Sequence, residues 1–174
     1  MKFDLNKAIE ILERTPFVLE TMLSDISDDW STTNEGPQTW SPYDVIGHLI
    51  HGEKTDWIPR MELILSDVPD KTFQPFDRFA QLKSSEGKSL RQLLEEFAVL
   101  RRKNVGKLKG RNPTAADLKR TGIHPDLGVV TLEQHLSTWV VHDLDHIAQV
   151  ARVMAKQYGA EIGPWAKYLK ILGQ

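Results

Sequence analysis

Two histidines in the C-terminal half of the chain have the spacing of a metal-binding pair. They are His142 and His146, in the mostly apolar segment VVHDLDHIAQVARVM. A helix advances about 100° per residue, so side chains four positions apart project from one face. Two imidazoles placed in this way can bind one transition-metal ion. The same pair can also be structural, because a buried imidazole is satisfied when it donates to a carbonyl, and the spacing alone leaves both interpretations open.

A third ligand would have to come from another part of the chain. The residue after His142 is Asp143, so the segment lacks the glutamate of the HExxH zinc-protease motif. Catalytic zinc commonly takes three protein ligands and keeps one position open. In VIGHLIHGE, His48 lies beside Val45 and Leu49 on the apolar stripe of a predicted helix, from which it can point across a helical bundle. His48 is therefore the favoured third ligand.

Helical phase places further side chains near these histidines. His135 precedes His142 by seven residues, so it shares the same face, but it is two turns or about 10 Å away and too distant to share an ion. The carboxylate of Asp145 either orients an imidazole or forms a surface ion pair with Arg152 or a lysine. For Trp139, a place in the core is the favoured interpretation over contact with a substrate. The candidates for lining the pocket are His51, His135, Trp139, Asp145 and Gln149.

The N-terminal third of the chain predicts two long helices. Apolar residues recur at three- and four-residue steps over positions 5–26, which is typical of one buried helix face. Thr15 is a good N-cap and Pro16 suits the first helical position, so we expect a short lead-in helix and a new start there. The next helix is predicted over residues 41–66, with a kink at Pro59 because proline lacks the backbone donor.

The remainder of the chain predicts two more helices and no strand longer than a few residues. Residues 67–88 show no periodicity and are too long for a tight turn, which favours a crossover connection. A third helix is predicted from Ser89. After the loop GIHPDLGVVT, Thr131 opens the last helix with Gln134 at the capping-box position. The pattern predicts an all-α protein, a four-helix bundle with a long crossover between helices 2 and 3.

Composition limits the class of protein. A chain of 174 residues, 40% of them hydrophobic, fits a single domain over residues 1–174. The net charge of -2 gives no pull toward nucleic acid, and the basic run RRKNVGKLKGR is better explained as the solvated C-terminal end of a helix. The absence of a signal peptide or an apolar run of membrane length predicts a cytoplasmic protein without a membrane partner. The absence of cysteine excludes thiolate ligands and cysteine nucleophiles.

Three segments together resemble the DinB-like superfamily of metal-dependent bundle proteins. They are WSPYDVIGHLIHGE, FDRF and GIHPDLGVVTLEQHLSTWVVHDLDHIAQVARVMA. The resemblance implies a four-helix bundle with an up-down-down-up path, commonly a homodimer. It also implies a divalent ion, zinc or nickel, held by His48 of the second helix and by His142 and His146 of the last.

The resemblance leaves the reaction open. Characterised relatives include S-transferases and isomerases that depend on bacillithiol or mycothiol, so the leading hypothesis is an enzyme that transfers a low-molecular-weight thiol to a small-molecule electrophile. Because the chain has no cysteine, the sulfur would come from a cosubstrate. The alternatives are metal-dependent hydrolysis and a non-catalytic bundle that holds a structural ion or none.

Overall fold

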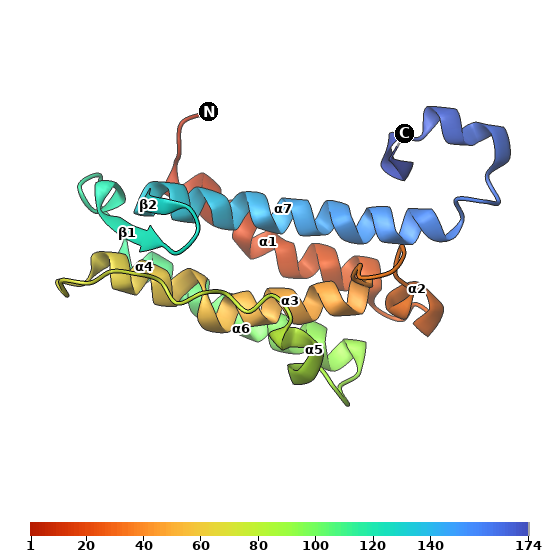
Figure 1. Ribbon diagram of the computed structural model, residues 1–174, viewed down its shortest axis with the longest axis horizontal. Coiled ribbons are helices and arrows are strands. Elements are labelled where there is room, and N and C mark those ends of the chain that lie inside the picture. The colour runs from red at the N-terminus through yellow and green to blue at the C-terminus, as the bar shows by residue number, and fades with distance from the viewer. Residues whose placement is uncertain (174) are drawn as a thin grey trace.

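Four long helices pack side by side, with a small β-hairpin at one end (Figure 1). The computed structural model describes residues 1–173. The bundle consists of α1 (Leu5–Leu23), α3 (Pro42–Thr55) continued by α4 (Trp57–Leu65), α6 (Leu90–Arg111) and α7 (Leu132–Gln157). The smaller elements are α2 (Asp28–Thr32), α5 (Ala80–Ser84), η1 (Asp117–Lys119), β1 (Thr121–His124), β2 (Gly128–Thr131), η2 (Gly163–Tyr168) and η3 (Lys170–Leu172). The predicted helical bundle is confirmed. None of the helices within residues 1–173 has the length and apolar character needed to span a bilayer.

Two apolar clusters show how the helices run. The cluster at the hairpin end contains Leu12, Met61, Leu108 and Leu136. The cluster at the opposite end contains Leu19, Ile46, Leu93 and Val150. The start of α1 and the start of α7 therefore pack against α4 and the end of α6. It follows that α1 and α7 run in one direction and α3–α4 and α6 run in the other, as Figure 1 also shows.

Helix α1 is continuous, so the expected break at Pro16 is wrong. Pro16 lies inside the helix and has no N–H to donate to the carbonyl of Leu12. Arg101 of α6 supplies the missing hydrogen bond, because its Nη1 donates to the Leu12 carbonyl at 3.0 Å. Thr15 does not cap a helix; its hydroxyl donates to Asp143 of α7 at 2.7 Å. A proline is tolerated here because another helix satisfies the carbonyl that it leaves free.

The helix predicted over residues 41–66 is interrupted, as expected from its proline. Ser41 and Asp44 form a capping box at its start. The helix breaks at Asp56, between α3 and α4, where φ is -111° and ψ is -74°. Pro59 cannot donate to the carbonyl of Thr55, which explains why the regular pattern fails at this point. The break separates α3, which carries His48, from α4, which packs at the hairpin end.

The segment GIHPDLGVVT, which was predicted to be a loop, is part of an antiparallel hairpin of two four-residue strands, so the prediction of a loop is wrong. Strand β1 pairs with β2 from Thr121–Thr131 to His124–Gly128. The outer edge of β1 pairs with the segment that connects α4 to α6. The N–H of Phe73 in this segment donates to the carbonyl of Ile123 at 2.8 Å. The hairpin is stabilised by a segment about fifty residues earlier in the chain, and no local pattern reveals such pairing.

The connection between α4 and α6 lies along α3 (Figure 1). It contains α5. Gly47 of α3 faces α5 so closely that an added Cβ would lie 2.5 Å from the hydroxyl of Ser85. The Tyr43 hydroxyl donates to the carbonyl of Lys88 at 2.8 Å. The connection is therefore packed onto the bundle by defined contacts. Helix α6 has Ser89 as its N-cap, at the residue where this helix was predicted to start, and α7 begins with the predicted capping box of Thr131 and Gln134.

A buried ionic cluster joins all four bundle helices. Arg101 of α6 is 1% exposed. It forms ion pairs with Glu53 of α3, at 2.8 Å, and with Asp143 of α7. Asn104 donates to the carboxylate of Glu53 at 2.9 Å, and Thr15 of α1 donates to Asp143. The charges are fully removed from water, so each must be matched by its partners.

We expect Asp143→Asn to reduce the free energy of unfolding by about 3–5 kcal/mol, because the guanidinium of Arg101 would stay buried without one of its carboxylates. Chemical denaturation measures this change. The control is Glu95→Gln, which breaks an exposed ion pair with Arg91 and should cost no more than about 1 kcal/mol. Equal effects of the two substitutions would contradict a stabilising role for the buried cluster.

Candidate metal centre

Three histidine side chains from two helices meet beside the bundle core. His48 comes from α3, and His142 and His146 come from α7. The Nε2 atom of His142 lies 3.1 Å from that of His48 and 3.1 Å from that of His146. All three donor atoms lie within 4.8 Å of one another. Two nitrogens bound to one tetrahedral zinc at 2.0–2.1 Å are about 3.3 Å apart, so the spacing fits a single ion.

The hydrogen bonding of His146 leaves its Nε2 atom free to bind a metal. Its Nδ1 atom lies 2.7 Å from the side-chain oxygen of Gln149. An amide oxygen only accepts, so Nδ1 carries the proton and Nε2 carries the lone pair. The Nε2 of His142 faces two other imidazole nitrogens at once, and a neutral ring nitrogen either donates or accepts, never both. A cation that accepts a lone pair from each ring satisfies all three Nε2 atoms.

Burial keeps these imidazoles neutral at physiological pH. It is the main cause that lowers the pKa of His48 to about 3, with the neighbouring His146 and His51 and the charge of Arg78 acting in the same direction. Burial likewise lowers the pKa of His142 to about 2, assisted by His146 and His48. The pKa of His146 is also lowered by burial, although Gln149 opposes the shift. Neutral imidazoles have the lone pairs that metal binding requires.

Aromatic rings surround the three histidines. Trp40 lies 4.7 Å from the ring of His48, measured between centroids, and Phe76 lies 5.4 Å from it on an edge-on approach. Trp57 packs edge-on against His142 at 5.0 Å. Sequence reasoning did not assign Trp40 and Phe76 to the site. The available signals were that Trp40 directly precedes the Ser-Pro helix start and that Phe76 belongs to the FDRF segment.

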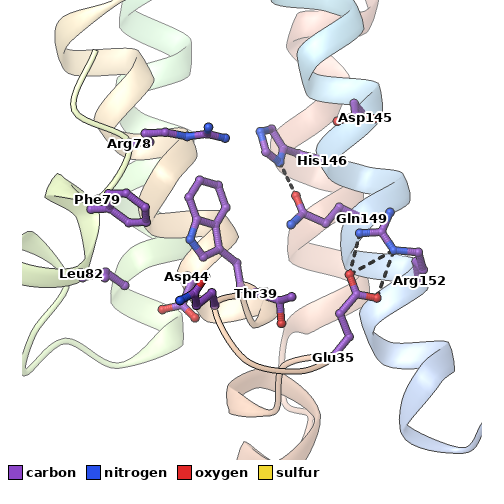
Figure 2. Close-up of a pocket in the computed structure, with 12 residues that line it drawn as sticks. Glu35, Thr39, Asp44, Arg78, Phe79, Leu82, Asp145, His146, Gln149 and Arg152 are labelled. Atoms are coloured by element: carbon purple, nitrogen blue, oxygen red, sulfur yellow. Dashed lines mark hydrogen bonds and ion pairs between the residues drawn. The ribbon is translucent and has the colours of Figure 1, made fainter. Parts of the chain in front are cut away.

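Two clefts open from the centre and share four lining residues. The larger, of about 870 Å³, extends between the loop after α2, the start of α5, and α7 (Figure 2). The smaller, of about 540 Å³, extends below the hairpin between α4 and the start of α7. The residues common to both are Trp40, Arg78, Asp145 and His146. All three histidines line the smaller cleft, and His146 also lines the larger one, so the two clefts meet at His146.

Three of the predicted pocket residues line these clefts. Asp145 is exposed and lines both. Within residues 1–173 it forms no ion pair with a lysine or with Arg152, which instead binds Glu35 at 2.8 Å, so the alternative of a surface ion pair is wrong. Gln149 lines the larger cleft and holds His146. His135 lines the smaller cleft, and its Nε2 donates to the carbonyl of Trp57 at 2.9 Å.

The other two predicted pocket residues line neither cleft. Trp139 is fully buried and stacks on Trp57 with 5.5 Å between the ring centroids, so its interpretation as a core residue is confirmed. His51 projects from α3 against Phe76, at 4.8 Å between centroids. It lies close to the Thr55 hydroxyl, one turn along the same helix. His51 therefore supports the ring of Phe76 and does not face either of the two clefts directly.

Comparison with known proteins identifies the family. The model of the DinB superfamily matches residues 11–150, and the chain belongs to this superfamily. A solved structure described as "YfiT from Bacillus subtilis is a probable metal-dependent hydrolase with an unusual four-helix bundle topology" superposes with a TM-score of 0.75 at 26% identity, covering 89% of this chain and 87% of YfiT. The four-helix bundle protein TT2238 superposes with a TM-score of 0.50 at 19% identity, covering 83% of this chain and 95% of TT2238. No curated protein sequence matches the chain.

The ion pairs of Glu35 at the edge of the larger cleft predict a specific dependence of stability on pH. The hydrogen bond from Arg152, with a further contribution from Lys156, lowers the pKa of Glu35 from 4.5 to about 2. A lowered pKa in the folded state stabilises the fold above about pH 4.5, and this contribution is lost as the pH falls toward 2. The difference in free energy of unfolding between wild type and Glu35→Gln should therefore be largest above pH 4.5 and vanish near pH 2.

Denaturation at a series of pH values measures this difference. The exposed Glu10 of α1 provides the control substitution Glu10→Gln, which should change the free energy of unfolding little at any pH. A difference for Glu35→Gln that grew as the pH fell would contradict the assignment.

Proposed function

We propose that this chain is a metal-dependent enzyme in which His48, His142 and His146 hold one divalent ion, zinc or nickel. The support is the close approach of the three Nε2 atoms, their burial and the hydrogen bond that leaves the lone pair of His146 on Nε2. Zinc and nickel both accept imidazole ligands, and three protein ligands leave a position for a substrate. The description of YfiT as a probable metal-dependent hydrolase supports the same class of centre.

The proposed reaction is the transfer of a low-molecular-weight thiol to a small electrophile. The observation that carries this proposal is the pair of clefts that join at His146, since a transfer reaction has two substrates that must meet at one point. The chain contains no cysteine, so the sulfur would belong to the cosubstrate. A bound divalent ion supplies the positive charge that favours the thiolate form of a thiol near neutral pH.

In this proposal the chain itself positions the reactants. Gln149 orients the imidazole of His146. Trp40 and Phe76 exclude water from one side of the centre, because both rings lie against His48. Exclusion of water strengthens electrostatic interactions within the site and protects a thiolate from competing proton donors.

Metal-dependent hydrolysis is the second candidate, and the description of YfiT favours it. It would use the same centre with water in place of the thiol, and it would need only one of the two clefts for its substrate. The remaining candidate is a non-catalytic bundle that holds the same ion, which activity assays distinguish from the two enzymes. The homodimer, the cytoplasmic location and the absence of a nucleic-acid partner stay predictions of the sequence.

We expect elemental analysis of protein purified without chelators or a histidine tag to find about one equivalent of zinc or nickel. His146→Ala and His142→Ala should contain none, because two imidazoles do not hold the ion through purification. His124→Ala is the control, since His124 lies on the hairpin and its loss should leave the metal content unchanged. A full equivalent of metal in His146→Ala would contradict the ligand assignment.

Thiol transfer predicts that the metal-loaded protein accelerates the conjugation of bacillithiol or another small thiol with monochlorobimane. Fluorescence measures the product. Removal of the metal, or His142→Ala, should reduce the rate at least about 100-fold, because the thiolate would lose several kcal/mol of stabilisation. Turnover of esters or amides without thiol would instead establish hydrolysis, and the absence of both activities would leave only a binding bundle.

A further inference from the structure

One cation stands at the junction of the two clefts without a protein partner. Arg78 belongs to the connection between α4 and α6 and lines both clefts. Figure 2 shows its side chain extending from this connection into the cleft toward His146. Arg78 lines the smaller cleft together with His48, His142 and His146. The positive charge of Arg78 therefore borders the same space as the three-histidine centre.

The other cations around the clefts are engaged. Arg60 pairs with Asp56 at 2.9 Å, and Arg152 and Lys156 both pair with Glu35. Within residues 1–173, no ion pair or hydrogen bond of the Arg78 side chain is present. Asp145 lies on the far side of the cleft in Figure 2 and does not reach it. Arg78 is thus the cleft cation available to a ligand.

The chemistry of Arg78 indicates what that ligand carries. A guanidinium presents a planar fork of donors that matches a carboxylate in two parallel hydrogen bonds. The larger cleft also contains the carboxylates of Asp44 and Asp145. Because these repel anions, a ligand with one negative charge suits the cleft better than a phosphate monoester with two. The aromatic rings of Trp40 and Phe76 border the centre, and they suit the organic part of a small molecule.

We propose that Arg78 binds a carboxylate of the substrate while another group of the same molecule occupies the three-histidine centre. The substrate class is therefore a small organic carboxylate. This inference rests on the proposed metal centre, but it does not require that the reaction be thiol transfer. Arg78 determines which molecules are selected and takes no part in bond making or breaking.

Two matched pairs of probes test this role on the zinc-loaded protein by isothermal titration calorimetry. The thiol pair is 3-mercaptopropanoate and 3-mercaptopropanamide. The hydroxamate pair is succinic acid monohydroxamate and its terminal amide, which bind zinc without thiol chemistry. Within each pair only the negative charge differs. We expect wild type to bind the carboxylate at least about tenfold more tightly than the amide. This ratio of affinities is the size expected from one charge-assisted hydrogen bond.

Arg78→Met should abolish this preference and leave the affinity for the amides unchanged, and Arg78→Lys should retain part of it. The control is Arg102→Met, which removes the same charge from a groove between α1 and α6 that shares no residue with the two clefts. An equal preference in wild type and Arg78→Met would overturn the inference.

The two pairs separate this inference from the proposed function. If hydroxamates show a preference that depends on Arg78 but neither thiol binds, thiol transfer fails and the carboxylate site stands. If both thiols bind equally well in wild type and in Arg78→Met, the carboxylate site fails and thiol binding stands. If wild type takes up neither zinc nor nickel, both proposals are wrong.

Discussion

The interaction on which the structure depends is the burial of one guanidinium among four helices. Arg101 contacts Leu12 of α1, Glu53 of α3 and Asp143 of α7 from its place on α6. A charge at 1% exposure is costly in free energy unless its partners are in the correct geometry. Any sliding of α3 or α7 along the bundle would break at least one of these contacts. The ionic cluster therefore restricts the packing of the helices to one register.

The same register brings the histidines together. Glu53 follows His48 by five residues on α3, and Asp143 directly follows His142 on α7. When both carboxylates reach Arg101, the two helices are aligned so that the Nε2 atoms of His48 and His142 lie 3.1 Å apart. Neighbouring residues of α7 point about 100° apart. One helix therefore contributes Asp143 to the buried cluster and His142 to the candidate metal centre without conflict.

The outer wall of the site comes from the long connection between α4 and α6. This connection holds Phe76 against His48 and brings Arg78 to the junction of the clefts. It is anchored at one end by its pairing with β1, through Phe73 and Ile123, and at the other by Tyr43 of α3. The hairpin that sequence reasoning missed thus helps to hold the segment that covers the centre.

The sequence by itself determined the helices and most of their ends, because these depend on contacts three or four residues apart. The capping boxes at Ser41, Ser89 and Thr131 are examples. It also indicated that His48, His142 and His146 would converge, since apolar periodicity showed which face of each helix is buried. The local signal failed at Pro16, because the residue that satisfies the Leu12 carbonyl is 89 positions away.

Only the tertiary structure decided the features that depend on distant residues. Arg101 is separated from Asp143 by 42 positions and from Glu53 by 48, so a basic residue in a basic run gave no sign of its burial. The hairpin depends on pairing with residues 71–73. Phe76 and Arg78 border the centre only because the connection between α4 and α6 lies along α3. Periodicity and capping report short-range contacts, whereas these features arise only when packing brings remote parts of the chain together.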